Sequence, residues 1–261
     1  MTTTLGTDRI LRLLQEVADE VITPRFRSLD EDEISSKSHP GDLVTVADRE
    51  AEVIITRELA AAYPQAVILG EEAFADDASS MAAFRRAEHA FTVDPVDGTR
   101  NFVHGSPDHA VMVAETRGGR AVRAWIWQPQ HQLAYVAEVG AGATRNGDAL
   151  AMLAPGSDPA GWRVRTSARR RVGEQVGAMP PLELSWVSCG IDYPKLAEGE
   201  CEALLYQGTR PWDHVPGSLL VGELGGAVGT DEGEPYGPRS EPRRILATAG
   251  PEVYEGLRRE L

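Results

Sequence analysis

Hydrophobic residues along the first third of the chain recur at helical spacing. Between residues 10 and 21 they return every three or four positions, which predicts an amphipathic helix. Thr7 or Asp8 would cap this helix, and it would end near Pro24. A second helix is predicted over residues 46–63, because a proline follows directly.

Short apolar runs in the middle of the chain predict strands. The runs at 66–72 and 90–97 each end on carboxylates. Asn146-Gly147 predicts a two-residue hairpin turn, since both residue types tolerate positive φ. The run of antiparallel strands expected around it covers residues 109–116, 123–129, 132–140 and 142–150.

The second half of the chain also combines predicted strands and helices, and these are shorter. Strands are expected at 162–167 and 182–188, and helices across 193–206, after Trp212 and after Pro251. Strands and helices do not alternate regularly as in a parallel doubly wound sheet, so the pattern favours an α+β fold. The polar, Gly- and Pro-containing stretch 154–162 predicts a boundary between an N-terminal lobe, 1–153, and a C-terminal lobe, 154–261.

Composition and charge exclude several classes of protein. The 261 residues are 42% hydrophobic and 25% charged, as in ordinary globular domains. A formal net charge of −14 makes nucleic-acid binding unexpected, because a phosphate backbone requires clustered Lys and Arg. Cys189 and Cys201 form no CxxC pattern, so a disulfide framework or structural zinc is not expected.

Neither a leader sequence nor a membrane anchor is expected. The first ten residues lack the basic and apolar regions of a signal peptide, and no window approaches about 18 uninterrupted apolar residues. A cytoplasmic location without membrane association is the expectation.

Four carboxylates lie where apolar runs stop: Glu71, Asp94, Asp97 and Asp213. Carboxylates that converge at one point repel one another unless they are protonated or bridged by metal. All-oxygen ligation suits hard divalent cations, and Mg²⁺ takes a few carboxylates together with water and substrate phosphate.

The stretch "DPVDGT", residues 94–99, adds features for holding phosphate. Pro95 stiffens the turn and leaves the Val96 carbonyl free as a further metal ligand. Gly98 and Thr99 can open a helix whose free N–H groups point at an anion. Taken alone, this stretch is equally compatible with an acidic turn that caps a helix.

Five motifs in register resemble the inositol monophosphatase family of Mg²⁺-dependent, often lithium-sensitive phosphatases. "DPVDGTRNF" is similar to the family signature D-P-[ILV]-D-G-T-x-N-F, and "GEE" at 70–72 to its upstream metal-ligand motif. "WDHVPGSLLVGELGG" at 212–226 resembles the downstream motif. "KSHPGDLVTVAD" at 37–48 and "GAGATRNGDAL" at 140–150 resemble its N-terminal segment and its hairpin.

The resemblance implies a ligand set for Mg²⁺, with two or three ions in the site. Glu71, Asp94 and the Val96 carbonyl would hold the ion that activates water. Asp94 would bridge to a second ion shared with Asp97 and Asp213, which stabilises the leaving alkoxide.

The resemblance also implies roles around these ions. Gly98 and Thr99 would bind the phosphate through their N–H groups, and the Thr99 hydroxyl would orient the attacking water with Glu71. Asp48 would support a third ion through water, on the segment that contains Lys37. Lys37 itself is as compatible with a solvated loop position as with a functional one.

The family further implies an αβαβα sandwich, a homodimer and inhibition by lithium. Its members act on small phosphorylated metabolites: inositol phosphate, histidinol phosphate, a sugar phosphate or a nucleoside bisphosphate. Cys189 and Tyr206 occupy substrate-specificity positions. Tyr206 stands where inositol-specific members carry a carboxylate, which weakens the case for inositol.

Two alternative functions, neither of them enzymatic, are also compatible with the sequence. The chain could be a non-catalytic regulatory protein that retains the phosphatase frame and acts through partners. It could also be a module that binds Mg²⁺ or Ca²⁺ without catalysis, although Thr99 beside Glu71 favours an enzyme.

Overall fold

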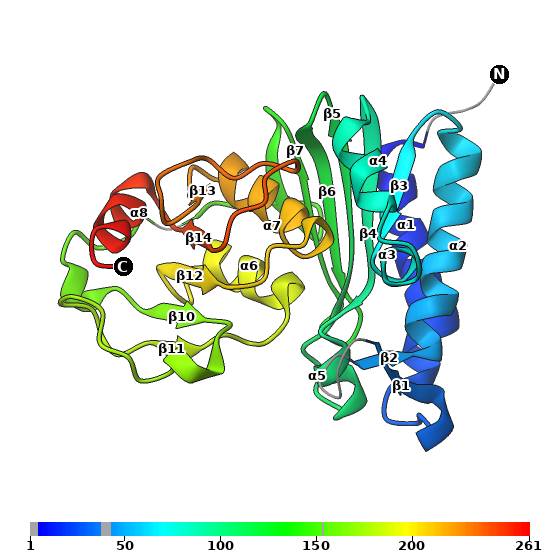
Figure 1. Cartoon of the computed structure of the whole chain (residues 1–261), viewed down its shortest axis with the longest axis horizontal. Helices are drawn as coiled ribbons and strands as arrows, with labels where there is room; N and C mark the ends of the chain where they lie inside the picture. Colours follow the sequence, from blue (N-terminus) through cyan, green and yellow to red (C-terminus); the bar gives the residue numbers. More distant parts are fainter. Residues whose placement is uncertain (1–4, 38–42, 153) are drawn as a thin grey trace.

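The computed structural model describes residues 5–37, 43–152 and 154–261, which fold into five alternating layers of helix and sheet (Figure 1). Helices α1 (Thr7–Val17) and α2 (Val46–Ala62) cover one face of a seven-stranded sheet. Helices α6 (Cys189–Ala197) and α7 (Pro211–Glu223) lie between this sheet and a five-stranded sheet, and α8 (Pro251–Arg258) covers the far side. The predicted α+β fold and its αβαβα layering are confirmed.

The large sheet has the strand order β3-β4-β5-β6-β7-β8-β9. Only β3 and β4 are parallel, and every later neighbour is antiparallel. The strands are β3 (Val67–Gly70), β4 (His89–Asp97), β5 (Ala110–Arg117), β6 (Arg120–Gln128), β7 (Leu133–Glu138), β8 (Gly142–Arg145) and β9 (Asp148–Ala149).

The small sheet has the order β11-β10-β12-β14-β13 and mixes parallel with antiparallel pairs. Its strands are β10 (Val164–Thr166), β11 (Glu183–Leu184), β12 (Ala203–Tyr206), β13 (Ala227–Gly229) and β14 (Ile245–Thr248). A separate ribbon pairs β1 (Ile34–Ser36) with β2 (Leu43–Thr45).

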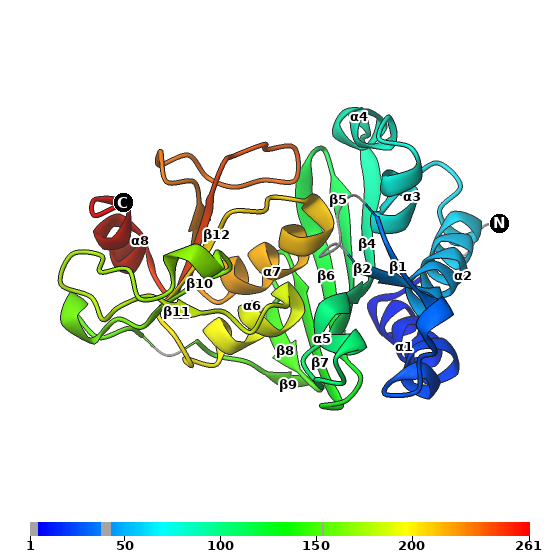
Figure 2. The same ribbon diagram turned by 60° about the horizontal axis from the view of Figure 1, so that its bottom comes forward.

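Short helical segments connect the layers. The α-helical ones are α3 (Glu71–Asp76), α4 (Ser80–Arg86) and α5 (Thr99–Val103). The π-helix Ala18–Ile22 continues α1, and 3₁₀ turns occupy Thr23–Arg25, Glu31–Glu33, Pro159–Gly161 and Arg169–Arg171. In Figure 2, α3 lies below α4 on the α2 side of the large sheet, and α5 lies at the lower end of the sheet.

The central strands are apolar on both faces because helices cover both. In β5, Val111 and Val113 pack beneath α1 and α2, whereas Ala110 and Met112 face the layer of α6 and α7. The alternation of side chains along a strand separates these two sets. This double burial explains why the sequence there reads as one continuous hydrophobic run.

Several boundaries predicted from sequence hold. Helix α2 ends within one residue of the predicted Tyr63. Asn146 and Gly147 both have positive φ, 51° and 86°, at the turn between β8 and β9. The predicted hairpin is therefore confirmed.

Three local predictions are wrong. The helix expected over 193–206 ends at Ala197, and 203–206 form strand β12, because Gly199 adopts φ 79° and "ALLY" pairs with β10 and β14. The strand expected over 182–188 covers only Glu183–Leu184. Gly6, not Thr7 or Asp8, is the N-cap of the first helix.

Within the described residues, every helix is too short or too polar to cross a lipid bilayer.

Helices α6 and α7 pack closely at a glycine. A Cβ placed on Gly217 of α7 would lie 2.1 Å from the Tyr193 ring, whereas a Cβ on Gly222 of the same helix would have no neighbour within 4 Å. Tyr193 is fully buried in the core below the small sheet. Gly217 therefore sets the distance between α6 and α7.

We expect Gly217→Ala to destabilise the protein by about 1–3 kcal/mol, because the new methyl group overpacks the contact with Tyr193. The matched control is Gly222→Ala, which should be neutral or stabilising by up to about 1 kcal/mol, since alanine favours helix. Urea unfolding of both variants measures this. Equal stability of the two variants would contradict close packing at Gly217.

Candidate active site

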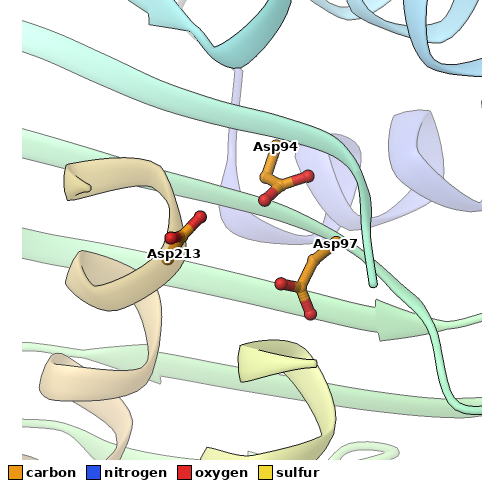
Figure 3. A group of neighbouring side chains, drawn as sticks. All are labelled: Asp94, Asp97 and Asp213. Carbon is orange, nitrogen blue, oxygen red and sulfur yellow. The ribbon is translucent and has the colours of Figure 1, made fainter. Parts of the chain in front are cut away.

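Three aspartates meet at the end of β4 and the start of α7. Asp94 and Asp97 belong to β4, and Asp213 lies in the first turn of α7. One carboxylate oxygen from each lies within 4.8 Å of the others. Figure 3 shows the three side chains pointing into a common space between the strand and the helix.

The local backbone explains why both β4 aspartates face Asp213. Residues three apart on a regular strand point to opposite faces of the sheet. The register between β4 and β5 shifts between Asp94 and Asp97, where Pro95 cannot donate a ladder hydrogen bond. This irregularity turns both carboxylates to the same side.

The cluster is electrostatically unfavourable by itself, with Asp94 and Asp97 buried and Asp213 half-buried. Burial, followed by the charges of Glu71 and Asp97, raises the pKa of Asp94 and of Asp213 well above the usual range. Burial likewise raises the pKa of Asp97 to about 6. Among the described residues, Asp94 Oδ1 is buried without a hydrogen-bond partner. A bound cation would give this oxygen a partner.

Asp97 is held by the first turn of α6. The Gly190 N–H donates to one carboxylate oxygen at 2.7 Å, and the Cys189 N–H donates to the other at 3.2 Å. The Ser188 hydroxyl also donates to Asp97. These donors lower the pKa of Asp97 against the effect of burial, so they favour its charged form.

The predicted turn after Asp97 is present. Gly98 adopts φ 83° and precedes α5, which begins at Thr99. A Cβ on Gly98 would lie 2.9 Å from the Ser188 side chain, so glycine is needed for both conformation and space. The Thr99 hydroxyl lies 3.0 Å from both Asp48 Oδ1 and the Val96 carbonyl oxygen.

Asp48 supports this turn from within the protein. It is fully buried in the first turn of α2, where it accepts hydrogen bonds from the Thr45 N–H and hydroxyl. Burial raises its pKa to about 6. Asp48 does not line the cavity itself, but it contacts Thr99, which does.

Glu71 faces the aspartates and is paired with Lys37. The Lys37 ammonium lies 2.7 Å from a Glu71 oxygen and 2.5 Å from a Glu72 oxygen. With its side chain only 10% exposed, Lys37 is not a solvated loop residue. Of the predicted N-terminal segment 37–48, residues 38–42 lie outside the described part of the chain.

A cavity of about 250 Å³ brings most predicted residues together. Of the predicted set, Lys37 instead lines an adjoining cavity of about 690 Å³, which shares Glu71 and Asp213 with the first. The predicted residues that line the smaller cavity are Glu71, Asp94, Val96, Asp97, Gly98, Thr99, Cys189, Tyr206 and Asp213.

The wall of the cavity away from the aspartates carries Tyr206. This ring is 2% exposed and stacks on Tyr193 with ring centres 5.4 Å apart. Its hydroxyl donates to Asp192 Oδ2 at 3.3 Å. Asp192 also accepts from the Trp186 N–H at 2.7 Å, and burial raises its pKa to about 7. A carboxylate thus lines this wall, contributed by α6.

Sequence reasoning missed two buried carboxylates near the site, Asp192 and Glu52. Asp192 is a lone acid in the apolar stretch "CGIDYP", which gives no signal of its position. Glu52 follows Asp48 by four residues, so the two lie on one face of α2. Two acids at this spacing on a helix that packs against the core could have indicated that Glu52 is buried near the site.

Comparisons with known proteins show the family to which the chain belongs. The model of the inositol monophosphatase family matches residues 7–261. The inositol-1-monophosphatase of Bacillus subtilis is 31% identical over 216 residues, which cover 78% of each chain. The Nus factor SuhB of Pseudomonas aeruginosa is 32% identical over 227 residues, covering 81% of this chain and 80% of that protein.

A solved structure shares the same fold. The Thermotoga maritima IMPase superimposes with a TM-score of 0.83 at 23% identity, covering 97% of this chain and 94% of that one. The resemblance inferred from the five motifs is therefore confirmed. With a family model that spans nearly its whole length, this chain belongs to the inositol monophosphatase family.

Proposed function

We propose that the chain is a Mg²⁺-dependent phosphatase that hydrolyses a phosphate monoester of a small metabolite. The observation that carries the proposal is the buried group of Asp94, Asp97 and Asp213, which includes a carboxylate oxygen without a partner among the described residues. Membership of the inositol monophosphatase family supports the same reaction class.

The donor set fits a hard divalent cation. Asp94, Asp97, Asp213, Glu71 and the Val96 carbonyl offer only oxygen, as Mg²⁺ prefers. When bound, Mg²⁺ supplies an acidified water and neutralises charge on the phosphoryl group.

The residues around the cluster position the reactants. The N–H groups of Gly98 and Thr99, at the wall of the cavity, would bind phosphoryl oxygens. Asp48 holds the Thr99 hydroxyl beside Glu71, where the two would orient the attacking water. These contacts favour the correct geometry for direct attack by water.

Cys189 is not suited to act as a nucleophile. Burial and then the charges of Asp97 and Asp213 raise the pKa of its thiol well above the usual range. The thiolate is the reactive form of cysteine, and this environment disfavours it. Hydrolysis by water, without a covalent intermediate on the protein, is the reaction that the site supports.

The leaving group would occupy the wall formed by Tyr206 and its neighbours. Ser167, Ser185 and Asp192 line it together with Tyr206, so it presents hydroxyl and carboxylate oxygens. Such a wall suits an alcohol that carries several hydrogen-bonding groups. Inositol phosphate, histidinol phosphate, a sugar phosphate and a nucleoside bisphosphate remain the candidate substrates.

Four further features stay predictions: the division into lobes 1–153 and 154–261, the homodimer, the cytoplasmic location and the weaker third ion near Asp48.

A regulatory protein that retains the phosphatase frame is the second candidate function. The observation that favours it is the 32% identity to a protein named Nus factor SuhB. The two functions can be distinguished in a strain that lacks the gene. If expression of Asp94→Asn or Asp213→Asn fully restores the wild-type phenotype, the function is regulatory. A phenotype that neither variant rescues follows from catalysis.

Phosphate release from the four candidate substrates should require Mg²⁺. We expect at least one to be hydrolysed with Mg²⁺ and none with EDTA, because in the proposed reaction the nucleophile is a water molecule that the bound cation activates. A colorimetric phosphate assay with both additions measures this. Release that is undiminished in EDTA would contradict the proposed function.

Asp213→Asn should lower kcat/KM by about a thousandfold, since the cation contributes several kcal/mol to the transition state. In EDTA its melting temperature should equal or exceed that of the wild type, because the substitution removes one of several buried, mutually repelling charges. Asp148→Asn, an exposed position in β9, is the control. A large loss of stability in Asp213→Asn would indicate a structural role instead.

Millimolar lithium should inhibit the enzyme by replacing the more loosely held ion. Initial rates at several Mg²⁺ concentrations, with sodium chloride as the ionic-strength control, test this expectation. Rates that are the same in lithium and in sodium would argue against the two-ion assignment.

A further inference from the structure

Glu52 is a buried carboxylate that joins helix α2 to the turn carrying Glu71. Its side chain reaches the first turn of α3, where Oε2 accepts from the Glu72 N–H and Oε1 from the Ala73 N–H, each at 2.8 Å. The first N–H groups of a helix have no partner within the helix. Gly70, the N-cap of α3, has no side chain to satisfy them. Glu52 therefore caps α3 from a different helix.

Gly70 is fitted to this contact. Its backbone, at φ −93° and ψ 153°, is extended and open to any residue. A Cβ at this position would, however, lie 2.3–2.6 Å from the carboxyl atoms of Glu52. Glycine is thus required here for space rather than for conformation, and the space is occupied by the Glu52 carboxylate.

We propose that Glu52 is a positioning residue that fixes Glu71 for metal binding. The inference rests on the proposed function, in which Glu71 is a metal ligand. Glu71 is the first residue of α3 and directly follows β3, which pairs with β4 up to Gly70 and Val93. The sheet holds the backbone before Glu71, and Glu52 holds the two N–H groups after it.

The same face of α2 also holds a second residue of the cavity wall. Asp48, one turn before Glu52, contacts the Thr99 hydroxyl at 3.0 Å. One rigid helix thereby fixes Thr99 through Asp48 and Glu71 through Glu52. The spacing of Asp48 and Glu52 along α2 thereby helps to set the position of Thr99 relative to Glu71.

A glutamine at position 52 would preserve shape but not this function. A carboxylate presents two acceptor oxygens, one for each of the Glu72 and Ala73 N–H groups, whereas an amide presents one oxygen and one NH₂. The NH₂ would face a backbone N–H, donor against donor. The turn would then shift away, and the Glu71 carboxylate with it.

Mn²⁺ binding in the absence of substrate tests the proposal directly. We expect Glu52→Gln to weaken the affinity by about 10-fold or more, as for other groups that orient metal ligands. The free Mn²⁺ signal in electron paramagnetic resonance measures it. In kinetics, the Mg²⁺ concentration for half-activation should rise by a similar factor, while KM for the phosphate ester at saturating Mg²⁺ stays within about twofold.

The matched control is Glu50→Gln, on the same helix but exposed and paired with Arg25 at 2.8 Å; its Mn²⁺ affinity should equal that of the wild type. Should Glu52→Gln fail to fold, Gly70→Ala disturbs the same contact by displacing the carboxylate, and Glu52→Asp should retain part of the affinity. Wild-type Mn²⁺ affinity in a folded Glu52→Gln or Gly70→Ala, even with a lowered melting temperature, would overturn the proposal.

Failure of the Glu52 proposal can be distinguished from failure of the proposed phosphatase activity. If the wild-type protein binds Mn²⁺ but releases phosphate from no ester, the proposed phosphatase activity is refuted. The role of Glu52 in metal binding can still be tested by the Mn²⁺ affinities of the variants. A wild-type protein that binds no Mn²⁺ would overturn both.

Discussion

Repulsion among buried carboxylates is the constraint that the rest of this structure accommodates. Asp94 and Asp97 are buried and Asp213 is half-buried where the three are drawn together, and Glu71 adds a further charge. The protein offsets part of this cost with N–H groups at the start of α6 and with the Lys37 ammonium. Asp94 Oδ1 still has no hydrogen-bond partner among the described residues, and a divalent cation would supply one.

The layered fold can hold these repelling carboxylates close together because each of them lies where a strand ends or a helix begins. Backbone at these junctions is rigid on one side and rich in unpaired N–H groups on the other. Burial of both faces of the central sheet holds the junctions in place, and Trp212 packs with Leu69 and Ala90 beside Asp213. The core thus serves the site by preventing the charges from moving apart.

The convergence of Asp94, Asp97 and Asp213 could be predicted from sequence because each carboxylate interrupts an apolar run, and such interruptions mark the ends of buried elements. The layering followed from the family resemblance. Strand β12 was missed because a short apolar stretch after a helix has no periodicity that separates strand from helix. The contacts of Glu52 with α3 and of Asp192 with Tyr206 depend on tertiary packing, which no local pattern encodes.

The distribution of the ligands along the chain links the site to the order of folding. Glu71, Asp94 and Asp97 belong to the first half of the chain, while Asp213 is synthesised far later, on a helix that packs across β4, β5 and β6. Contacts of such long sequence separation form late and slowly. A chain still emerging from the ribosome therefore lacks Asp213 at the cluster, and the three aspartates come together only when α7 has docked on the large sheet.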